Sequence, residues 1–229
     1  MDKNSGNKDG RCILVCAGDL EISEIPVKPE DYVIAVDGGY LYCQVFGIEP
    51  DVMIGDFDSL AETYCEQTQP QESGRPHGAE GKKPRVIRLD CVKDDTDTLA
   101  AIRHGLENGY REFHLYGALG GRLEHTIANL QCLHFLKNAG AVGYIWDGTV
   151  MITLIRNESL SFRKEMEGLV SVFAVGGEAR GVTEKGLRYA LDDAVVRCDF
   201  PIGVSNEFTG QKAEIEVRDG SLLIVVRWE

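Results

Sequence analysis

Two aspartates flank a phenylalanine in GDFDS, residues 55–59, directly after the apolar run at 52–54. An apolar run that meets a glycine is typical of a buried strand that ends at that point. Each carboxylate raises the free energy of ionising its neighbour unless a positive group lies between them. Asp56 and Asp58 stand at alternate positions of the turn, so they can point into one cavity and share a hard cation. The stretch therefore predicts a metal site at the end of a strand.

Glycines, acids and bases also follow three other predicted strands. The segment DGG follows the strand predicted at 32–36, KDDTD follows the one at 85–89, and GGRLEH follows the one at 112–117. Ligands of an open parallel sheet bind outside the carboxyl ends of its strands, so these segments are expected to meet at one rim. The candidate site residues of this rim are Asp37, Gly38, Gly39, Asp56, Asp58, Lys93, Asp94, Thr96, Asp97, Gly121, Arg122, Glu124 and His125.

The residue types at this rim suit phosphoryl transfer. Mg²⁺ is held by one or two carboxylates together with waters and substrate phosphates, and the predicted ligands are Asp56, Asp58 and Asp97. Glycines let backbone amides approach phosphate oxygens, while Lys93 and Arg122 supply positive charge for the group in transfer. The chain has no GxxxxGK[ST] segment. The residues therefore predict phosphoryl-type transfer on a scaffold other than a P-loop.

Each of these residues also has a purely structural explanation. Asp58 or Ser59 could cap the helix that follows, and the acids within 94–97 could favour the start of the next helix through its dipole. The glycine pairs could be ordinary turns, and Arg122 and His125 could be surface residues of a first helical turn. Capping needs one acid, however, and three acids occur within 94–97 beside a lysine. This excess favours a ligand site.

Two parts of the chain have different apolar periods. From residue 11 to about 147, short apolar runs alternate with helix-length segments, a pattern typical of a parallel sheet covered on both faces. From about residue 149 the runs are short and rich in β-forming residues, and Asp219-Gly220 is a hairpin turn signal. We therefore predict an α/β fold with two domains. A three-layer, parallel-sheet nucleotide-binding domain occupies 1–148, and an antiparallel β-sandwich occupies 149–229.

Composition limits the partners of the chain. It has 229 residues with 37 acids and 24 bases, a formal net charge of −13, which opposes polynucleotide binding through clustered Lys and Arg. No stretch approaches the ~20 apolar residues of a membrane-spanning helix, and the polar N-terminus lacks the apolar centre of a secretory signal. Seven cysteines without a CxxC pair indicate reduced thiols. These features predict a cytoplasmic protein that binds neither nucleic acid nor membrane.

Five segments, in order along the chain, resemble those of the thiamine pyrophosphokinase family. They are AVDGG (35–39), GDFDS (55–59), KDDTD (93–97), GALGGRLEHTIANL (117–130) and GVSNEF (203–208). The resemblance covers nearly the whole chain, and it implies that ATP and thiamine give thiamine diphosphate and AMP with Mg²⁺. It also implies a homodimer in which thiamine lies between the α/β part of one subunit and the sandwich of the other.

The resemblance also assigns roles residue by residue. The metal-binding carboxylates of the family correspond to Asp56, Asp58 and Asp97. Its nucleotide and phosphate contacts correspond to Asp37, Asp94, Thr96 and Arg122. Ser205 and Asn206 resemble the thiamine-recognising pair, and Tyr189 occupies the position of a large residue near the thiamine ring. The family usually has aspartate in GGRxDH, where this chain has Glu124, a carboxylate with one more methylene.

Two other functions stay open on the residues alone. A pyrophosphokinase for another small alcohol, such as a pterin, would share the rim and differ at Tyr189, Ser205 and Asn206. A nucleotide-sensing module without catalysis is disfavoured, because a sensor need not keep every acid of the predicted metal site. A Ca²⁺ module of the EF-hand kind is excluded, since the chain lacks a twelve-residue DxDxDG loop.

Overall fold

The short apolar runs of the N-terminal part form a parallel sheet. Its strand order is β5-β1-β2-β3-β4, and each neighbouring pair is parallel. The strands are β1 Cys12–Val15, β2 Tyr32–Val36, β3 Val52–Gly55, β4 Arg85–Arg88 and β5 Glu112–Tyr116. β1 and β3 are buried along their whole length, which explains why their sequences are continuously apolar. β4 lies at the end of the strand order and is largely exposed, and its two arginines suit an edge strand.

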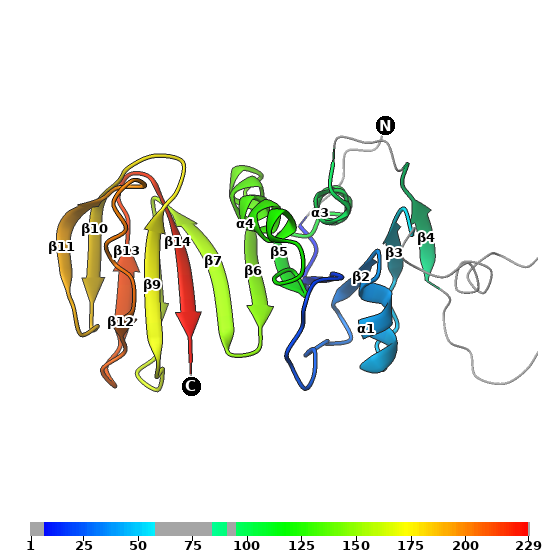
Figure 1. Ribbon diagram of the computed structural model, residues 1–229, viewed down its shortest axis with the longest axis horizontal. Coiled ribbons are helices and arrows are strands. Elements are labelled where there is room, and N and C mark those ends of the chain that lie inside the picture. Colours follow the sequence, from blue (N-terminus) through cyan, green and yellow to red (C-terminus); the bar gives the residue numbers. More distant parts are fainter. Residues whose placement is uncertain (1–6, 58–83, 91–94, 229) are drawn as a thin grey trace, which may run out of the picture. The chain divides into compact units, whose positions relative to one another are not determined.

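The structure is a computed structural model that describes residues 7–57, 84–90 and 95–228 (Figure 1). It divides into two compact units, residues 1–132 and 133–229. The helices of the described residues are α1 Gly39–Val45, α3 Asp97–Glu107 and α4 Leu123–Asn138. α3 packs on β1, β2 and β3 of the parallel sheet. None of the helices in these described ranges is long and apolar enough to cross a membrane.

The C-terminal unit contains two sets of antiparallel strands. The strand order is β12-β9-β14-β7-β6 in the first and β11-β10-β13-β8 in the second. The strands are β6 Val142–Asp147, β7 Val150–Arg156, β8 Ser159–Phe162, β9 Leu169–Ala174, β10 Ala179–Lys185, β11 Leu191–Val196, β12 Asn206–Glu207, β13 Ala213–Glu216 and β14 Ser221–Arg227. Alternating residues of both sheets form one apolar core, which includes Val172, Ile224, Val182 and Ile215. This inward alternation is what a β-sandwich requires.

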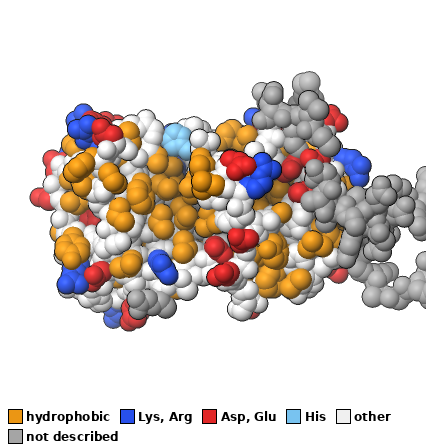
Figure 2. Space-filling view, viewed as in Figure 1, with side chains coloured by type: hydrophobic (Ala, Val, Ile, Leu, Met, Phe, Trp, Pro, Cys, Tyr) orange, Lys and Arg blue, Asp and Glu red, His pale blue; other side chains and the backbone are white. Residues whose placement is uncertain are grey.

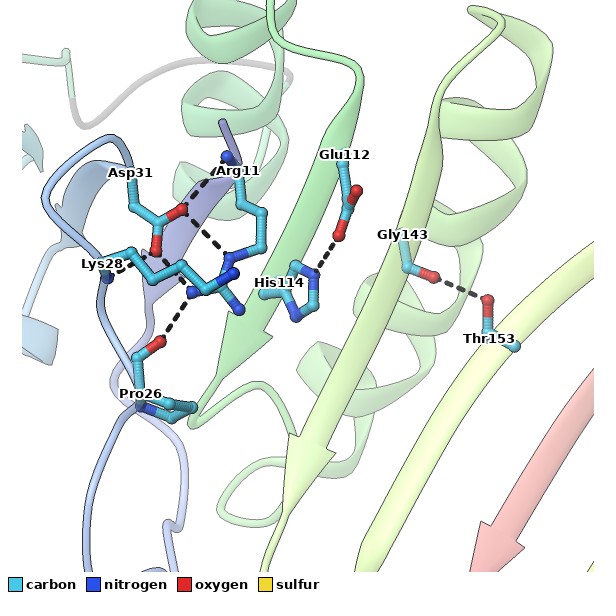
Figure 3. A network of polar contacts seen from close by, with 8 residues as sticks. All are labelled: Arg11, Pro26, Lys28, Asp31, Glu112, His114, Gly143 and Thr153. Carbon is cyan, nitrogen blue, oxygen red and sulfur yellow. Dashed lines mark hydrogen bonds and ion pairs between the residues drawn. The ribbon is translucent and has the colours of Figure 1, made fainter. Parts of the chain in front are cut away.

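The predicted fold class is confirmed: a parallel α/β sheet is followed by an antiparallel sandwich. The predicted domain boundary between residues 148 and 149 falls in the turn from β6 to β7, whereas the two compact units divide within α4. The boundary therefore stays a prediction. β6 pairs with β7 in an antiparallel ladder, and the buried hydroxyl of Thr153 donates to the carbonyl of Gly143 at 2.8 Å (Figure 3).

An ion pair joins the amino ends of β1 and β2, opposite the edge where ligands of a parallel sheet bind (Figure 3). The Asp31 side chain is 1% exposed and accepts hydrogen bonds from the Arg11 guanidinium and from the Lys28 amide at 2.8 Å. Burial raises the pKa of the Asp31 carboxyl, but the hydrogen bonds from Arg11 and Lys28 outweigh burial and hold that pKa below its ordinary value. The pair therefore stabilises the N-terminal unit without touching the predicted rim.

We expect Asp31→Ala to lower the free energy of unfolding by about 2–4 kcal/mol, because it leaves the part-buried Arg11 charge and the Lys28 amide without their acceptor. Urea unfolding at pH 7 measures the change. A carboxylate with a lowered pKa stabilises the fold above its unfolded-state pKa and loses that effect as the pH falls through the folded-state pKa. The difference between parent and variant should therefore shrink below about pH 4.

Asp199→Ala is the matched control for this substitution. Asp199 pairs with Arg197 through two hydrogen bonds, of 2.9 and 2.7 Å, but both side chains are more than half exposed. Exposed pairs contribute about 0–1 kcal/mol. An Asp31→Ala variant no less stable than Asp199→Ala would show that the buried pair adds nothing to stability.

Candidate active site

Three carboxylates converge at the carboxyl ends of the parallel strands. Asp37 directly follows β2, Asp56 directly follows β3, and Asp97 is the first residue of α3. One oxygen of each carboxylate lies within 4.8 Å of the other two, and all three side chains are partly buried. The structure thus brings Asp56 and Asp97 together, as the strand-end rule predicts, and adds Asp37 to them. Asp58 lies outside the described residues.

The close approach of β2 and β3 at their ends depends on Gly55. A Cβ atom at Gly55 would lie 2.9 Å from the Cα of Asp37, a distance that real side chains do not tolerate. The amide of Asp37 donates to the carbonyl of Ile54 at 2.8 Å, and Asp37 has a φ of 47°. Phe57, which is buried, has a φ of 59°, a conformation that is uncommon for a bulky residue. Such backbone strain is found where a site must hold side chains in one place.

The three carboxylates fit a divalent cation by their chemistry and spacing. Three negative charges this close repel one another, and a cation between them offsets that repulsion. Mg²⁺ binds oxygen at about 2.0–2.1 Å in octahedral geometry, so adjacent ligands of one ion lie roughly 3 Å apart and opposite ones about 4 Å. Oxygens within 4.8 Å of one another reach such positions by small side-chain rotations.

A cavity of about 460 Å³ opens beside this carboxylate group. Its volume lies within the usual range for small-molecule sites, about 300–1,000 Å³. The lining residues come from the ends of β1, β2 and β5, from the segment before α4, and from the first turn of α3 and the first two turns of α4. Predicted site residues on its wall are Asp37, Thr96, Asp97, Gly121, Arg122 and His125. Lys93 and Asp94 lie outside the described residues.

The glycine-rich segment 117–121 forms one wall of the cavity, and two residues that the sequence did not single out hold it in place. The carboxylate of Asp19 accepts a hydrogen bond from the amide of Gly121 at 2.9 Å. Asn129 is buried, and its amide donates to the carbonyl of Ala118 at 2.8 Å. Asp19 comes shortly after β1, so the strand-end rule that selected the other acids would also have selected Asp19.

Arg122 and Glu124 form an exposed ion pair at the entrance of α4. The Arg122 Nε donates to a Glu124 carboxylate oxygen at 2.7 Å, and the side chains are 72% and 64% exposed. A hydrogen bond from its own backbone amide, followed by the one from Arg122, lowers the pKa of the Glu124 carboxyl. His125 is exposed beside them. The longer side chain at position 124 therefore reaches the arginine that the sequence predicts to handle phosphate.

Three other candidate site residues, Thr96, Gly38 and Gly39, have structural roles in the described fold. The Thr96 hydroxyl caps α3 by accepting a hydrogen bond from the Leu99 amide at 3.2 Å. Gly38 is the N-cap residue of α1, and a Cβ atom at Gly39 would lie 1.9 Å from the carbonyl oxygen of Val15. Gly39 is thus required for the close packing of α1 against β1. Asp95, which was not selected, pairs with Arg103 of α3 at 2.8 Å.

The predicted thiamine residues lie together in the C-terminal unit. Tyr189 lies in the segment between β10 and β11 and is 60% exposed. Figure 2 shows that other hydrophobic side chains also reach the surface of this unit. Ser205 is exposed and has a φ of 59°, while its amide donates to the hydroxyl of Ser171 at 2.9 Å. Asn206 is only 4% exposed and bonds to the backbone of Tyr189 at 2.9 and 2.7 Å. The three residues therefore form one connected group.

The chain is similar to known thiamine pyrophosphokinases. The family model of the thiamin pyrophosphokinase catalytic domain matches residues 26–142, and that of its vitamin B1 binding domain matches residues 157–222. Thiamine pyrophosphokinase of Bacillus subtilis is 24% identical over 193 residues, 84% of this chain and 85% of its own length. Thiamine pyrophosphokinase 1 of rice is 26% identical over 166 residues, 69% of this chain and 59% of its own length.

Solved structures share the fold. The crystal structure of the Bacillus subtilis thiamine pyrophosphokinase superposes with a TM-score of 0.80 at 21% identity, covering 96% of this chain and 99% of that one. The yeast enzyme gives a TM-score of 0.70 at 16% identity, with 97% and 88% covered. The catalytic-domain model alone matches more than half of the 229 residues. The chain therefore belongs to the thiamine pyrophosphokinase family of enzymes.

Proposed function

We propose that the chain transfers a pyrophosphoryl group from ATP to the primary alcohol of thiamine, giving thiamine diphosphate and AMP. The observation that carries the proposal is the grouping of Asp37, Asp56 and Asp97 beside a 460 Å³ cavity, within the segment that matches the catalytic domain of the family. The grouping and the cavity both suit the phosphates of a nucleotide bound with a cation.

In the proposed reaction, the alcohol oxygen of thiamine forms a bond to the β-phosphorus of ATP. The bond from that phosphorus to the oxygen bridging the α-phosphorus breaks, and AMP leaves. Asp56, Asp58 and Asp97, with Asp37 beside them, would hold Mg²⁺, which offsets the phosphate charge. Arg122 binds the group in transfer, and Asp94 or Asp97 takes the proton of the alcohol.

No covalent intermediate on the protein is part of the proposal. The thiol of Cys16 reaches the cavity wall, but burial raises its pKa to about 12, so it stays protonated at neutral pH. A thiol is a weak nucleophile in that state. The residues of the site therefore act by binding, orientation and charge, which are the main needs of phosphoryl transfer.

The deciding experiment measures AMP formation from Mg–ATP with and without thiamine. AMP that appears only with thiamine, together with an equal amount of thiamine diphosphate, supports the proposal. AMP formation that depends on a pterin alcohol would support the other pyrophosphokinase, and tight ATP binding without turnover would support a sensor.

We also propose a homodimer and a cytoplasmic location. Light scattering tests the dimer. For the location, the five cysteines of the described ranges are free thiols, the form in which a reducing compartment keeps cysteine.

For the thiamine end, we expect Ser205→Ala to raise the KM for thiamine about five- to tenfold and to leave the KM for ATP within about twofold. Ser205 is exposed and directly precedes Asn206, which bonds to the backbone of Tyr189, and one neutral hydrogen bond to a ligand contributes about 1–1.5 kcal/mol. Initial rates at varied thiamine and varied ATP measure both constants.

Ser159→Ala, an exposed serine at the start of β8, serves as the control and should leave both constants unchanged. A Ser205→Ala enzyme that loses ATP affinity and keeps its thiamine affinity would mean that the two ligands have been assigned to the wrong ends.

A further inference from the structure

The amide of Asn206 has no hydrogen-bonding capacity left for a ligand. Its Nδ2 donates to a carboxylate oxygen of Glu184 at 2.6 Å and to the carbonyl of Tyr189 at 2.7 Å. Its Oδ1 accepts from the amides of Tyr189 and Glu207, both at 2.9 Å. A side-chain amide has two N–H donors and an oxygen with two lone pairs. All four are used within the protein, and the side chain is buried.

The bonds between Asn206 and Tyr189 fasten one segment of the chain to another. The side-chain amide pairs with both the N–H and the C=O of Tyr189, as a peptide group of a neighbouring strand would. Next to it, the amide of Arg188 donates to the carbonyl of Glu207 at 3.0 Å, and Leu187 forms a bridge with Phe208. The position of Tyr189 relative to Ser205 is therefore set by Asn206.

Glu184 supplies the acceptor that this arrangement needs. It lies in β10, it is 1% exposed, and its second carboxylate oxygen is buried without a hydrogen-bond partner among the described residues. Burial raises the pKa of this carboxyl, and the hydrogen bond from Asn206 opposes the rise. A buried polar atom without a partner is costly, and an apolar side chain would avoid that cost. Packing alone therefore does not explain why a carboxyl group occupies this buried position.

We propose that Glu184 is a positioning residue for thiamine, and that it acts through Asn206. If the Asn206 amide rotated by half a turn, its oxygen would face the Glu184 carboxylate and the Tyr189 carbonyl, two acceptors. Glu184 therefore fixes the orientation of the amide, and the amide holds Tyr189 and Ser205 as a preformed face. Tyr189 and Ser205 then contact the ligand, whereas Asn206 does not. The inference rests on the proposed function, because thiamine is the ligand assigned to this face.

The test compares Glu184→Met with Glu184→Gln. Methionine has a similar length but cannot accept the Asn206 hydrogen bond well, whereas glutamine keeps an acceptor oxygen at the same place. We expect Glu184→Met to raise the KM for thiamine about tenfold, with kcat and the KM for ATP within twofold. Glu184→Gln should restore the KM for thiamine to within threefold of the parent. Glu214→Met, at a half-buried acid of β13 in the same sheet, should leave all three constants unchanged.

A second measurement does not depend on catalysis. Hydrogen–deuterium exchange of peptides covering residues 187–190 should be about tenfold faster in Glu184→Met and close to the parent in Glu184→Gln. Only the first substitution weakens the hydrogen bonds between Asn206 and the backbone of Tyr189. The buried acid can also be followed by pH. Because the pKa of the Glu184 carboxyl is raised on folding, the parent should lose stability relative to Glu184→Gln as the pH rises above about 4.5.

The outcomes separate this inference from the proposed function. If the parent forms no AMP with thiamine, the proposed function fails. If hydrogen–deuterium exchange at 187–190 is also the same in Glu184→Met as in the parent, Glu184 does not hold Tyr189 in place either. If the parent is active and Glu184→Met keeps its KM for thiamine within twofold, the positioning role is wrong. The role is likewise wrong if Glu184→Gln is as impaired as Glu184→Met, or if the KM for ATP rises by the same factor as that for thiamine.

Discussion

Asp97→Asn is expected to lower kcat by about a thousandfold while the protein stays folded. Asp97 shares a site with Asp37 and Asp56 at the carboxyl ends of the strands, and the proposed cation depends on their combined negative charge. A bound metal stabilises the transition state of phosphoryl transfer by several kcal/mol, and about 4 kcal/mol corresponds to about a thousandfold in rate. Initial rates of AMP formation at saturating Mg–ATP and thiamine measure the loss.

Asp95→Asn is the matched control, because it makes the same substitution two residues away on an acid that pairs with Arg103 outside the carboxylate group. Its rate should stay within about twofold of the parent. The melting temperature of metal-free Asp97→Asn should equal or exceed that of the parent, since removing one of three like charges relieves repulsion. Near-parental turnover in Asp97→Asn, or an equal loss in Asp95→Asn, would contradict the metal assignment.

The same assay decides between Asp37 and Asp58. The sequence predicts Asp58 as a metal ligand and Asp37 as a nucleotide contact, whereas the structure groups Asp37 with Asp56 and Asp97. Loss of a metal ligand weakens activation by Mg²⁺, so the Mg²⁺ concentration needed for half-maximal rate should rise about tenfold or more, by about 1.4 kcal/mol per factor of ten. Comparing Asp37→Asn with Asp58→Asn in such titrations shows which of the two binds the metal.

The fold could be predicted from the sequence because its signals are periodic. Buried strands between helices give continuous apolar runs, as at 12–15 and 52–55, and sandwich strands alternate, as in β9. The meeting of Asp56 and Asp97 could also be predicted, because carboxyl ends of parallel strands share one edge. Asp37 followed the same rule, but its distance from the other two acids depends on a backbone turn with positive φ, which the residue types do not specify.

Roles that depend on burial could not be predicted from residue types. Asn206 was expected to recognise thiamine, and a sequence does not reveal that both of its amide atoms are already bonded to protein. Glu184 gave no signal, since a glutamate in a β-rich segment is usually exposed. Thr96 is expected to contact phosphate, and residue types alone do not show that its hydroxyl oxygen also accepts the capping hydrogen bond of α3 from the Leu99 amide. Asn206 and Glu184 are 22 residues apart in sequence, and only the folded chain brings them together.

Arg122→Ala is expected to lower kcat/KM for ATP by about a hundred- to a thousandfold. Arg122 lines the cavity, and its ion pair with Glu124 is highly exposed and screened by water, so exchanging that carboxylate for a phosphate costs little. An arginine that stabilises the charge of a transferring phosphoryl group can contribute a factor of about 10³–10⁵ in the most dependent enzymes. The lower value here reflects the large exposure of the side chain to water. Arg122→Lys keeps the charge but loses the planar fork, so it should recover part of the rate, to within about tenfold of the parent.

Substitutions at Glu124 show which partner Arg122 serves in catalysis. If Glu124 only holds the guanidinium in the free protein, Glu124→Gln removes a competitor of the phosphate, and the KM for ATP should stay the same or fall by about twofold. If Glu124 itself contacts the nucleotide, as its place among the candidate residues of the rim predicts, the KM should rise by about ten- to a hundredfold, the effect of one lost hydrogen bond to a charged group. Glu124→Asp restores the residue that the family usually has, and it shortens the side chain that now reaches Arg122 at 2.7 Å. Full activity of Arg122→Ala would overturn the role of the arginine whatever Glu124 does. If Arg122→Ala loses activity and Glu124→Gln does not, Arg122 binds the phosphate during turnover. Glu124 then pairs with Arg122 only in the protein without nucleotide.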